Sequence, residues 1–398
     1  MKEFLNRVWP LRRGVRAMSY DVPSAGWTRR EVLETLVIGA AAANFCPRAL
    51  YAQEQGYPKG SIIRTILKDY APEDLAGGAT LFHEHLSLPP EFMPSWIRHA
   101  AETRAANAAP NAVPAATPPA TVPAATPSGP YFMQDLDLMV EELAAAKRDG
   151  IGCIVDGGHP DMGRDINFLR DLSIKSGMPI VASAGLYAQP FYSKEIAAMS
   201  EEQIVRALIQ QVEADPVGAF GEIGSWDDMT KDERKVFRAI AKAHLSTNLP
   251  IFTHTGIPGK AALEQLDILE DGGVNPNRVV IGHLGNLVDP AVQVHKAICR
   301  RGAFVGFDRQ GGSGDAQQVP MVMSLIEAGF ADNLLFSSDF SSAAQLKRNN
   351  KDMGYGKTLT VFVPKLKAAG ANEEVLRKIM TDNPRRFLAF VPKVKRAT

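Results

Sequence analysis

The chain has 398 residues, of which 45% are hydrophobic and 22% are charged, an ordinary balance for a globular protein. Basic and acidic residues both number 44, so the net charge is zero, which argues against nucleic acid or an anionic membrane as a bulk partner. The three cysteines are too few for a disulfide framework.

The first 52 residues have the pattern of an export signal. Arg29 and Arg30 precede an apolar, Ala-rich stretch at 36–45, and small residues follow at 49–52. That stretch is too short to cross a bilayer of roughly 30 Å. The paired arginines resemble the twin-arginine type of signal. We therefore expect export through the twin-arginine machinery to the periplasm or the medium, with residues 53–398 forming one folded domain.

A second atypical segment, residues 100–130, consists mainly of Ala, Pro and Thr. Such a composition buries too little apolar surface to order a chain, and its prolines lack backbone donors. We expect a disordered insertion in a loop.

From residue 78 onward, short apolar runs alternate with helical patterns. Eight runs lack polar alternation, as expected for strands buried on both faces. They span 80–86, 153–156, 180–184, 219–223, 251–254, 279–283, 303–307 and 334–338. Helices are expected at 137–147 and 166–176, and capping-box patterns open two more at Ser200 and Thr230. The sequence therefore predicts an α/β fold, a (β/α)₈ TIM barrel. An open doubly wound sheet is the alternative, but no glycine-rich phosphate loop follows the first strand.

Reactive groups of such a barrel lie at the carboxyl ends of its strands. Six candidate ligands stand at the ends of five predicted strands: His83, His85, Glu222, His254, His283 and Asp339. His83 and His85 are two apart, so both point the same way from one strand. Any one of these residues alone is more simply explained as a buried structural residue, but the six together predict a metal site.

The ligand types suit Zn²⁺ or a similar divalent ion. Six ligands exceed what one tetrahedral ion needs, which favours two ions with Glu222 as the bridge. Asp339 is expected to bind one ion and to accept the proton of the attacking water.

These residues resemble the phosphotriesterase-related family of the amidohydrolase superfamily. The resemblance runs from about Gly78 to Phe390 and includes the stretches Gly163-Arg164-Asp165, Gly221-Glu222-Ile223-Gly224, Gly282-His283-Leu284-Gly285, Gly306-Phe307-Asp308-Arg309 and Asp382-Asn383-Pro384. It implies that His83, His85 and Asp339 hold a buried ion, and that His254 and His283 hold a more exposed one. Family members commonly dimerise, so a homodimer is expected too.

The sequence departs from the family pattern at one residue, and the resemblance also suggests two residues that contact the substrate. Glu222 stands where the best-known members carry a carboxylated lysine, which puts true phosphotriesterase activity in doubt. Arg309 lies in an Asp-Arg-x-Gly stretch that resembles lactonases, and Tyr187 stands where an aromatic residue covers the metals. The alternatives are a loop salt bridge for Arg309 and plain packing for Tyr187.

Other polar residues are assigned structural roles. We expect His159 to be a loop residue, His244 and His295 to be packing or surface residues, Cys153 to be an inert core thiol, and Glu84 to face the helix layer.

The resulting hypothesis is an exported hydrolase of lactones or other carboxylic esters, in which hydroxide held by the metals attacks the carbonyl. The alternatives are a phosphoester or phosphotriester hydrolase, an amide hydrolase, and a periplasmic metal- or ligand-binding protein without catalytic activity. Specificity in this fold lies in the loops after the strands, and we expect residues 341–356 to cap the site.

Overall fold

The computed structural model describes residues 56–107, 130–256, 259, 261–287, 289, 291–351 and 353–393. The expected export signal, residues 1–52, and residues 108–129 of the Ala/Pro-rich segment lie outside these ranges. No helix in the described part of the chain is long and apolar enough to span a membrane.

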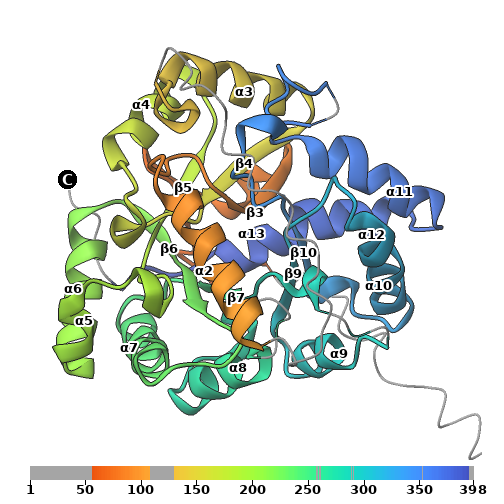
Figure 1. Cartoon of the computed structure of the whole chain (residues 1–398). Coiled ribbons are helices and arrows are strands. Elements are labelled where there is room, and N and C mark those ends of the chain that lie inside the picture. The colour runs from red at the N-terminus through yellow and green to blue at the C-terminus, as the bar shows by residue number, and fades with distance from the viewer. Residues whose placement is uncertain are drawn as a thin grey trace, which may run out of the picture. The chain divides into compact units, whose positions relative to one another are not determined.

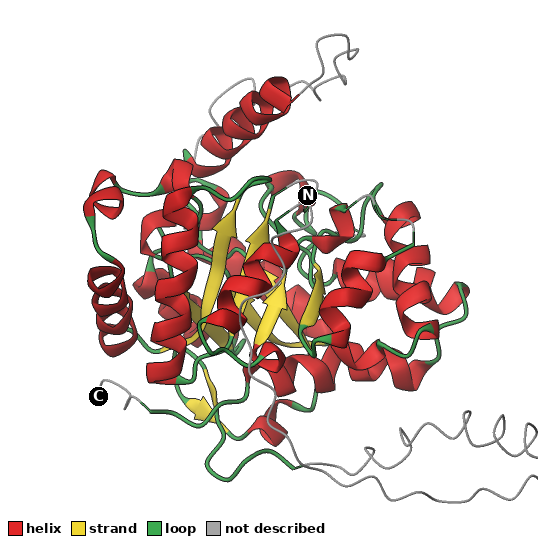
Figure 2. Ribbon diagram, turned by 90° about the horizontal axis from the view of Figure 1, so that it is seen from below, coloured by secondary structure: helices red, strands yellow, loops and turns green. Residues whose placement is uncertain are grey.

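Eight parallel strands form one sheet in the order β10-β9-β8-β7-β6-β5-β4-β3. Their bounds are β3 Ala79–Glu84, β4 Ile151–Asp156, β5 Ile180–Ala184, β6 Val217–Ser225, β7 Ile251–Thr255, β8 Val279–Ile281, β9 Phe304–Phe307 and β10 Leu334–Phe336. Helices surround them (Figure 1; Figure 2). All eight predicted strands are present, and the predicted (β/α)₈ barrel is confirmed.

The helices are α2 Phe92–Asn107, α3 Leu136–Arg148, α4 Ile166–Ser176, α5 Lys194–Ala198, α6 Glu201–Ala214, α7 Lys231–Thr247, α8 Ala262–Asp271, α9 Gln293–Arg300, α10 Asp315–Glu327, α11 Val363–Ala368, α12 Glu373–Arg377 and α13 Asn383–Leu388. Both predicted capping boxes are confirmed. Ser200 exchanges hydrogen bonds with Gln203 at the start of α6, and Thr230 does so with Glu233 at the start of α7.

The first and last barrel strands are joined by a side chain. Ser337, directly after β10, accepts a hydrogen bond from the backbone N–H of His83 at 3.1 Å. The hydroxyl of Ser337 lies 2.6 Å from the backbone carbonyl oxygen of His83. The N–H of Asp339 also donates to that carbonyl, at 3.3 Å. The strands that carry His83 and Asp339 are therefore held together at the carboxyl end of the barrel.

The barrel interior below the site is apolar. It contains Phe82, Val181, Ala219, Phe252, Val280, Phe304 and Leu335, contributed by different strands. A register shift between Leu81 and Glu84 marks a bulge in β3. The consecutive rings of Phe82 and His83 both pack on Phe252, with centroids at 6.5 and 5.3 Å. The bulge thus turns His83 inward, directly above the apolar layer.

Two details differ from the sequence prediction. Residues 100–107, expected to be disordered, form the last turns of α2; they are Ala-rich, and the first proline of the segment comes only at Pro110. Strands β8 and β10 end at Ile281 and Phe336, two residues earlier than predicted. His283, the last residue of the strand predicted over 279–283, has a φ of 62°, and a residue in the left-handed region cannot continue a strand.

Candidate metal centre

The structure brings all six predicted ligands together at the carboxyl end of the barrel. Glu222 lies at the centre. Its Oε1 is 3.2 Å from Nε2 of His85, and its Oε2 is 3.2 Å from Nε2 of His83 and 2.9 Å from Nδ1 of His254. Nε2 of His283 is 3.4 Å from the same oxygen. Glu222 therefore reaches the imidazoles on both sides, as a bridging carboxylate must.

The glycine before Glu222 allows the strand to pass close to its neighbour. Gly221 has a φ of 152°, and a Cβ atom there would lie only 2.3 Å from the ring of Phe252. The Gly221–Glu222 peptide bond is cis. Only glycine fits at this point of β6.

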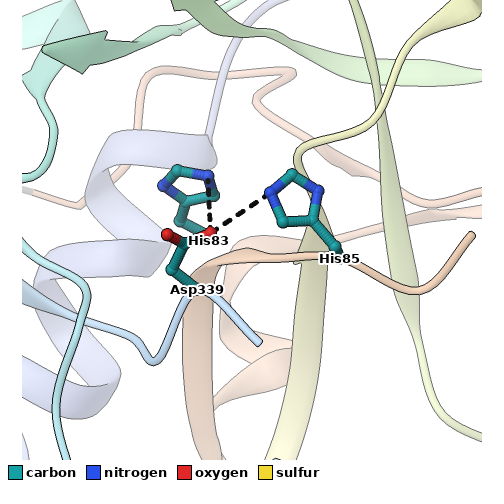
Figure 3. A group of neighbouring side chains, drawn as sticks. All are labelled: His83, His85 and Asp339. Atoms are coloured by element: carbon teal, nitrogen blue, oxygen red, sulfur yellow. Dashed lines mark ion pairs between the residues drawn. The ribbon is translucent and has the colours of Figure 1, made fainter. Parts of the chain in front are cut away.

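Asp339 faces the two histidines of the first strand. Its Oδ1 lies 3.2 Å from Nε2 of His85 and 3.9 Å from Nε2 of His83 (Figure 3). These three residues form one group whose ligand atoms all lie within 4.8 Å of one another. Glu222, His254 and His283 form a second such group, and His83, His283 and Asp308 form a third. The first two groups contain the residues expected to hold the two ions; that they hold two ions stays a prediction.

Asp308 supports two of the imidazoles, a role that the sequence analysis missed. Its carboxylate is 3.1 Å from Nδ1 of His83 and 2.8 Å from Nδ1 of His283. The two rings thereby direct Nε2 towards Glu222. A carboxylate behind a histidine that binds metal fixes the ring and its tautomer. Asp308 therefore fits an orienting role better than a ligand role, although the sequence offered only its place in the Asp-Arg-x-Gly stretch.

The donor set fits a divalent ion. Nε2 of His83 is buried and faces the Glu222 carboxylate at 3.2 Å without forming a hydrogen bond to it. Burial raises the pKa of Glu222, but the adjacent imidazoles of His83 and His254 hold it well below its usual range. The site therefore offers an ionised carboxylate together with buried imidazole nitrogens, which is the donor chemistry of Zn²⁺ and similar ions. That these residues hold metal stays a prediction.

Glu84 fixes the segment that carries Asp339. It is fully buried, and its carboxylate accepts the backbone N–H groups of Ser338 at 2.8 Å and of Phe340 at 2.9 Å. The expectation that Glu84 faces the helix layer stays a prediction; its contact with the segment 337–340 after β10 was not predicted.

His159 is likewise more than a loop residue. Its ring is completely buried, and Nε2 lies 3.0 Å from the carbonyl oxygen of Glu222. Nδ1 contacts the carboxylate of Asp161. Both partners are acceptors, so both ring nitrogens donate when the imidazole is protonated. Burial lowers the pKa of His159, but the Asp161 carboxylate raises it above its usual value and favours that form, in which His159 holds the backbone of the central carboxylate in place.

A cavity of about 500 Å³ opens above the candidate ligands. Tyr187 and Arg309 both line it, as do Phe92, Met93 and Trp96 from the start of α2. Residues Ser341, Gln345 and Met353 bring part of the expected capping segment into its wall. The contribution of α2 was not predicted, because the sequence signal there was dominated by the Ala/Pro-rich composition that follows.

Both substrate-site candidates contact the ligand set. The Tyr187 hydroxyl accepts a hydrogen bond from Nε1 of Trp96 at 2.9 Å and lies 3.0 Å from Nδ1 of His254. Arg309 donates through Nε to Oδ2 of Asp339 at 2.8 Å. The salt bridge considered for Arg309 therefore exists, but its partner is the predicted catalytic carboxylate rather than a loop residue.

The remaining predictions for polar residues hold. His244 and His295 are buried packing residues whose rings lie 2.7 Å and 2.8 Å from the carbonyl oxygens of Leu249 and Leu284. Cys153 is completely buried, and burial raises its pKa to about 12, so the thiol is inert.

The sequence of this chain is similar to those of known proteins. The profile of the phosphotriesterase family matches residues 64–388. An N-acetyltaurine hydrolase of Danio rerio is 26% identical over 350 residues, covering 82% of this chain and 98% of that protein. The phosphotriesterase homology protein of Escherichia coli (strain K12) is 30% identical over 248 residues, covering 60% of this chain and 84% of that protein.

A solved structure is similar as well. The crystal structure of the phosphotriesterase homology protein from Escherichia coli, complexed with phosphate in its active site, superposes with a TM-score of 0.65. The two chains are 25% identical, and the match covers 80% of this chain and 100% of that one.

Proposed function

This chain belongs to the phosphotriesterase family and is a hydrolase, and from that premise we propose that it cleaves lactones or other carboxylic esters with the help of two divalent metal ions, Zn²⁺ being the best fit. The observation that carries the proposal is the arrangement around Glu222, whose two oxygens face imidazoles of both candidate groups. One ion would be held by His83, His85 and Asp339. The other ion would be held by His254 and His283, and Glu222 would bind both ions. When bound, such a pair of ions acidifies water and polarises the bond under attack.

Asp339 supplies the proton acceptor. Burial raises its pKa, but the Arg309 guanidinium and the hydrogen bond with His85 hold that pKa well below the usual range. Its carboxylate is therefore ionised at neutral pH and can take the proton of the attacking water. Arg309 binds Oδ2 and so fixes the orientation of the carboxylate. The proton then passes to the leaving oxygen of the ester.

Tyr187 supplies a hydrogen-bond donor at the cavity wall. Burial and the anionic Glu222 raise the pKa of its phenol well above 10, so the hydroxyl keeps its proton. The Trp96 indole occupies one acceptor position of this hydroxyl. The hydroxyl also lies 3.0 Å from Nδ1 of His254, so its proton would turn from this imidazole to a substrate oxygen bound beside it.

Two other substrate classes each have an observation in their favour. Amides are favoured because N-acetyltaurine hydrolases recur among the similar proteins, including those of Danio rerio and Homo sapiens. Phosphoesters are favoured because the similar Escherichia coli structure holds phosphate in its active site. Glu222 in place of lysine weighs against phosphotriesters.

A substrate panel on protein lacking residues 1–52 tests the proposal. Lactones, aryl esters, N-acyl amides and phosphotriesters are compared with wild-type protein and with Asp339→Asn. Turnover of lactones or esters that is lost in Asp339→Asn, with an unchanged circular dichroism spectrum, supports the proposal. Turnover of amides or phosphoesters alone selects one of the other classes. Stoichiometric metal without any turnover would leave a metal-binding protein.

We also propose that the protein is exported by the twin-arginine machinery to the periplasm or the medium, and that it forms a homodimer. The supporting features are the paired arginines before residues 36–45 and the family membership. Cell fractionation of wild type and of an Arg29→Lys, Arg30→Lys variant tests the first point, and sedimentation of the mature chain tests the second.

A further inference from the structure

One cation in the cavity has no partner in the described part of the protein. Lys357 lines the same cavity as His85 and Asp339, although only 2% of the residue is exposed. Its ammonium group forms no hydrogen bond or ion pair with a described residue. Glu84, Asp339 and Asp315 act on it only as more distant charges. The other cation of the cavity, Arg309, is already paired with Asp339.

The side chain of Lys357 is held in place by the glycine of the Asp-Arg-x-Gly stretch. Gly311 has a φ of 80°, and a Cβ atom there would lie 2.9 Å from Cδ of Lys357 and 3.0 Å from its Cγ. The stem of the lysine therefore lies flat on the backbone of this loop. A fixed stem loses little further entropy when the ammonium binds a ligand.

Amide groups without partners line the same cavity. Gln310 is 1% exposed, and neither Nε2 nor Oε1 forms a hydrogen bond with a described residue. Nδ2 of Asn286 is also buried without a partner. Buried polar groups are normally paired, and leaving one unpaired costs free energy. An ammonium group with two amide donors is the chemistry that recognises an oxyanion.

We propose that Lys357, assisted by Gln310, binds an anionic group of the substrate, a carboxylate or sulfonate, away from the bond that is cleaved. The inference rests on the proposed function and restricts the class of substrates that it allows. The substrates would be acyl compounds with a negative charge on the acyl part or on the leaving part. The competing explanation is that Lys357 only neutralises the buried charges of Glu84 and Asp339. That explanation predicts an effect on stability but no preference between substrates.

The test uses two chromogenic esters that share one scissile bond. The 4-nitrophenyl monoester of glutarate carries a carboxylate, and its methyl ester does not. We expect wild-type, metal-loaded protein to prefer the anionic ester by about tenfold or more in kcat/KM, mainly through KM. Lys357→Met should reduce this ratio towards one, whereas Lys357→Arg should keep part of it. Lys367→Met, at an exposed lysine paired with Glu373, is the matched control and should leave the ratio unchanged.

A binding measurement separates this inference from the proposed function. Calorimetry compares glutarate, methanesulfonate and the uncharged glutaramide as ligands of the wild-type protein. Preferential binding of the two anions, weakened about tenfold in Lys357→Met and also weakened in Gln310→Leu, supports the subsite. Equal binding of all three, or equal turnover of both esters, overturns it and leaves the esterase proposal intact. No turnover of either ester, with selective anion binding, would sink the esterase proposal alone.

Discussion

Asp308 and His283 are connected twice. The carboxylate lies 2.8 Å from Nδ1 of the imidazole and accepts the backbone N–H of the same residue at 3.0 Å. Backbone and ring of His283 are thus fixed by one group, at a residue whose φ of 62° takes it out of the strand.

The first prediction concerns this carboxylate. Asp308→Asn should lower metal affinity about 10- to 100-fold, because the amide no longer fixes the tautomer of His83 and His283. Competition with a chelator measures the affinity. Asp315→Asn is the control: its buried carboxylate accepts the N–H of Gly311 without touching an imidazole. Equal affinity losses in both variants would point to a general loosening of the loop.

The second prediction concerns the bridge. Wild-type protein should contain about two ions per chain, and Glu222→Ala one or fewer, because both groups of ligands lose the carboxylate that they share. Elemental analysis gives the count. Glu142→Ala, which removes a buried carboxylate that accepts the N–H of Lys347, should keep both ions. A single ion in wild type, unchanged in Glu222→Ala, would require a mononuclear mechanism.

Tyr187 provides the third prediction. Tyr187→Phe should lower kcat by about 10- to 100-fold with unchanged metal content, because it removes only the donor beside His254. Tyr192→Phe is the control, since its hydroxyl donates to the backbone carbonyl of Tyr187 and lies outside the cavity lining. If both variants keep full activity, Tyr187 is a packing residue.

The fourth prediction concerns Glu84. In Glu84→Gln, an amide NH₂ must face a backbone N–H of Ser338 or Phe340, where a carboxylate oxygen accepted before. We expect a loss of about 1–3 kcal/mol in the free energy of unfolding, with a lower kcat because Asp339 lies between these residues. Urea denaturation and steady-state kinetics measure the two effects. Loss of stability with normal kcat would show that the position of Asp339 does not depend on Glu84.

The fifth prediction concerns pH. Burial lowers the pKa of His244 below its unfolded value of about 6.5. The unfolded chain therefore binds the proton first, and stability is lost as the pH falls from about 6.5 to the folded pKa. Each unit of difference corresponds to about 1.4 kcal/mol. Urea denaturation of metal-free protein at pH 7.5 and 5.5 should show a smaller pH effect in His244→Asn than in wild type. Identical pH effects would contradict this assignment.

The sequence was informative where the signal is local. The strands and the capping boxes at Ser200 and Thr230 depend on neighbouring residues, and α4 was predicted to the residue at Ile166–Ser176. The six candidate ligands were found because each directly follows or ends an apolar run.

The supporting residues could not be found in that way. Asp308 meets His83 across 225 residues, and Glu84 meets Ser338 across 254. Both contacts depend on which strands become neighbours in the closed barrel. Burial of His159 likewise depends on Glu222, 63 residues away.

The junction at Ser337 has a consequence for biosynthesis. Because this residue ties the last barrel strand to the first, the two residues that face each other in Figure 3, His83 and Asp339, meet only when the eighth strand has been added. A nascent chain that has left the ribosome only as far as β9 carries five of the six candidate ligands but not the carboxylate that completes the first group. The first candidate group can therefore form only after Asp339 has been synthesised, and a chain truncated before Ser337 would carry all four histidines of the two groups without the carboxylate of Asp339.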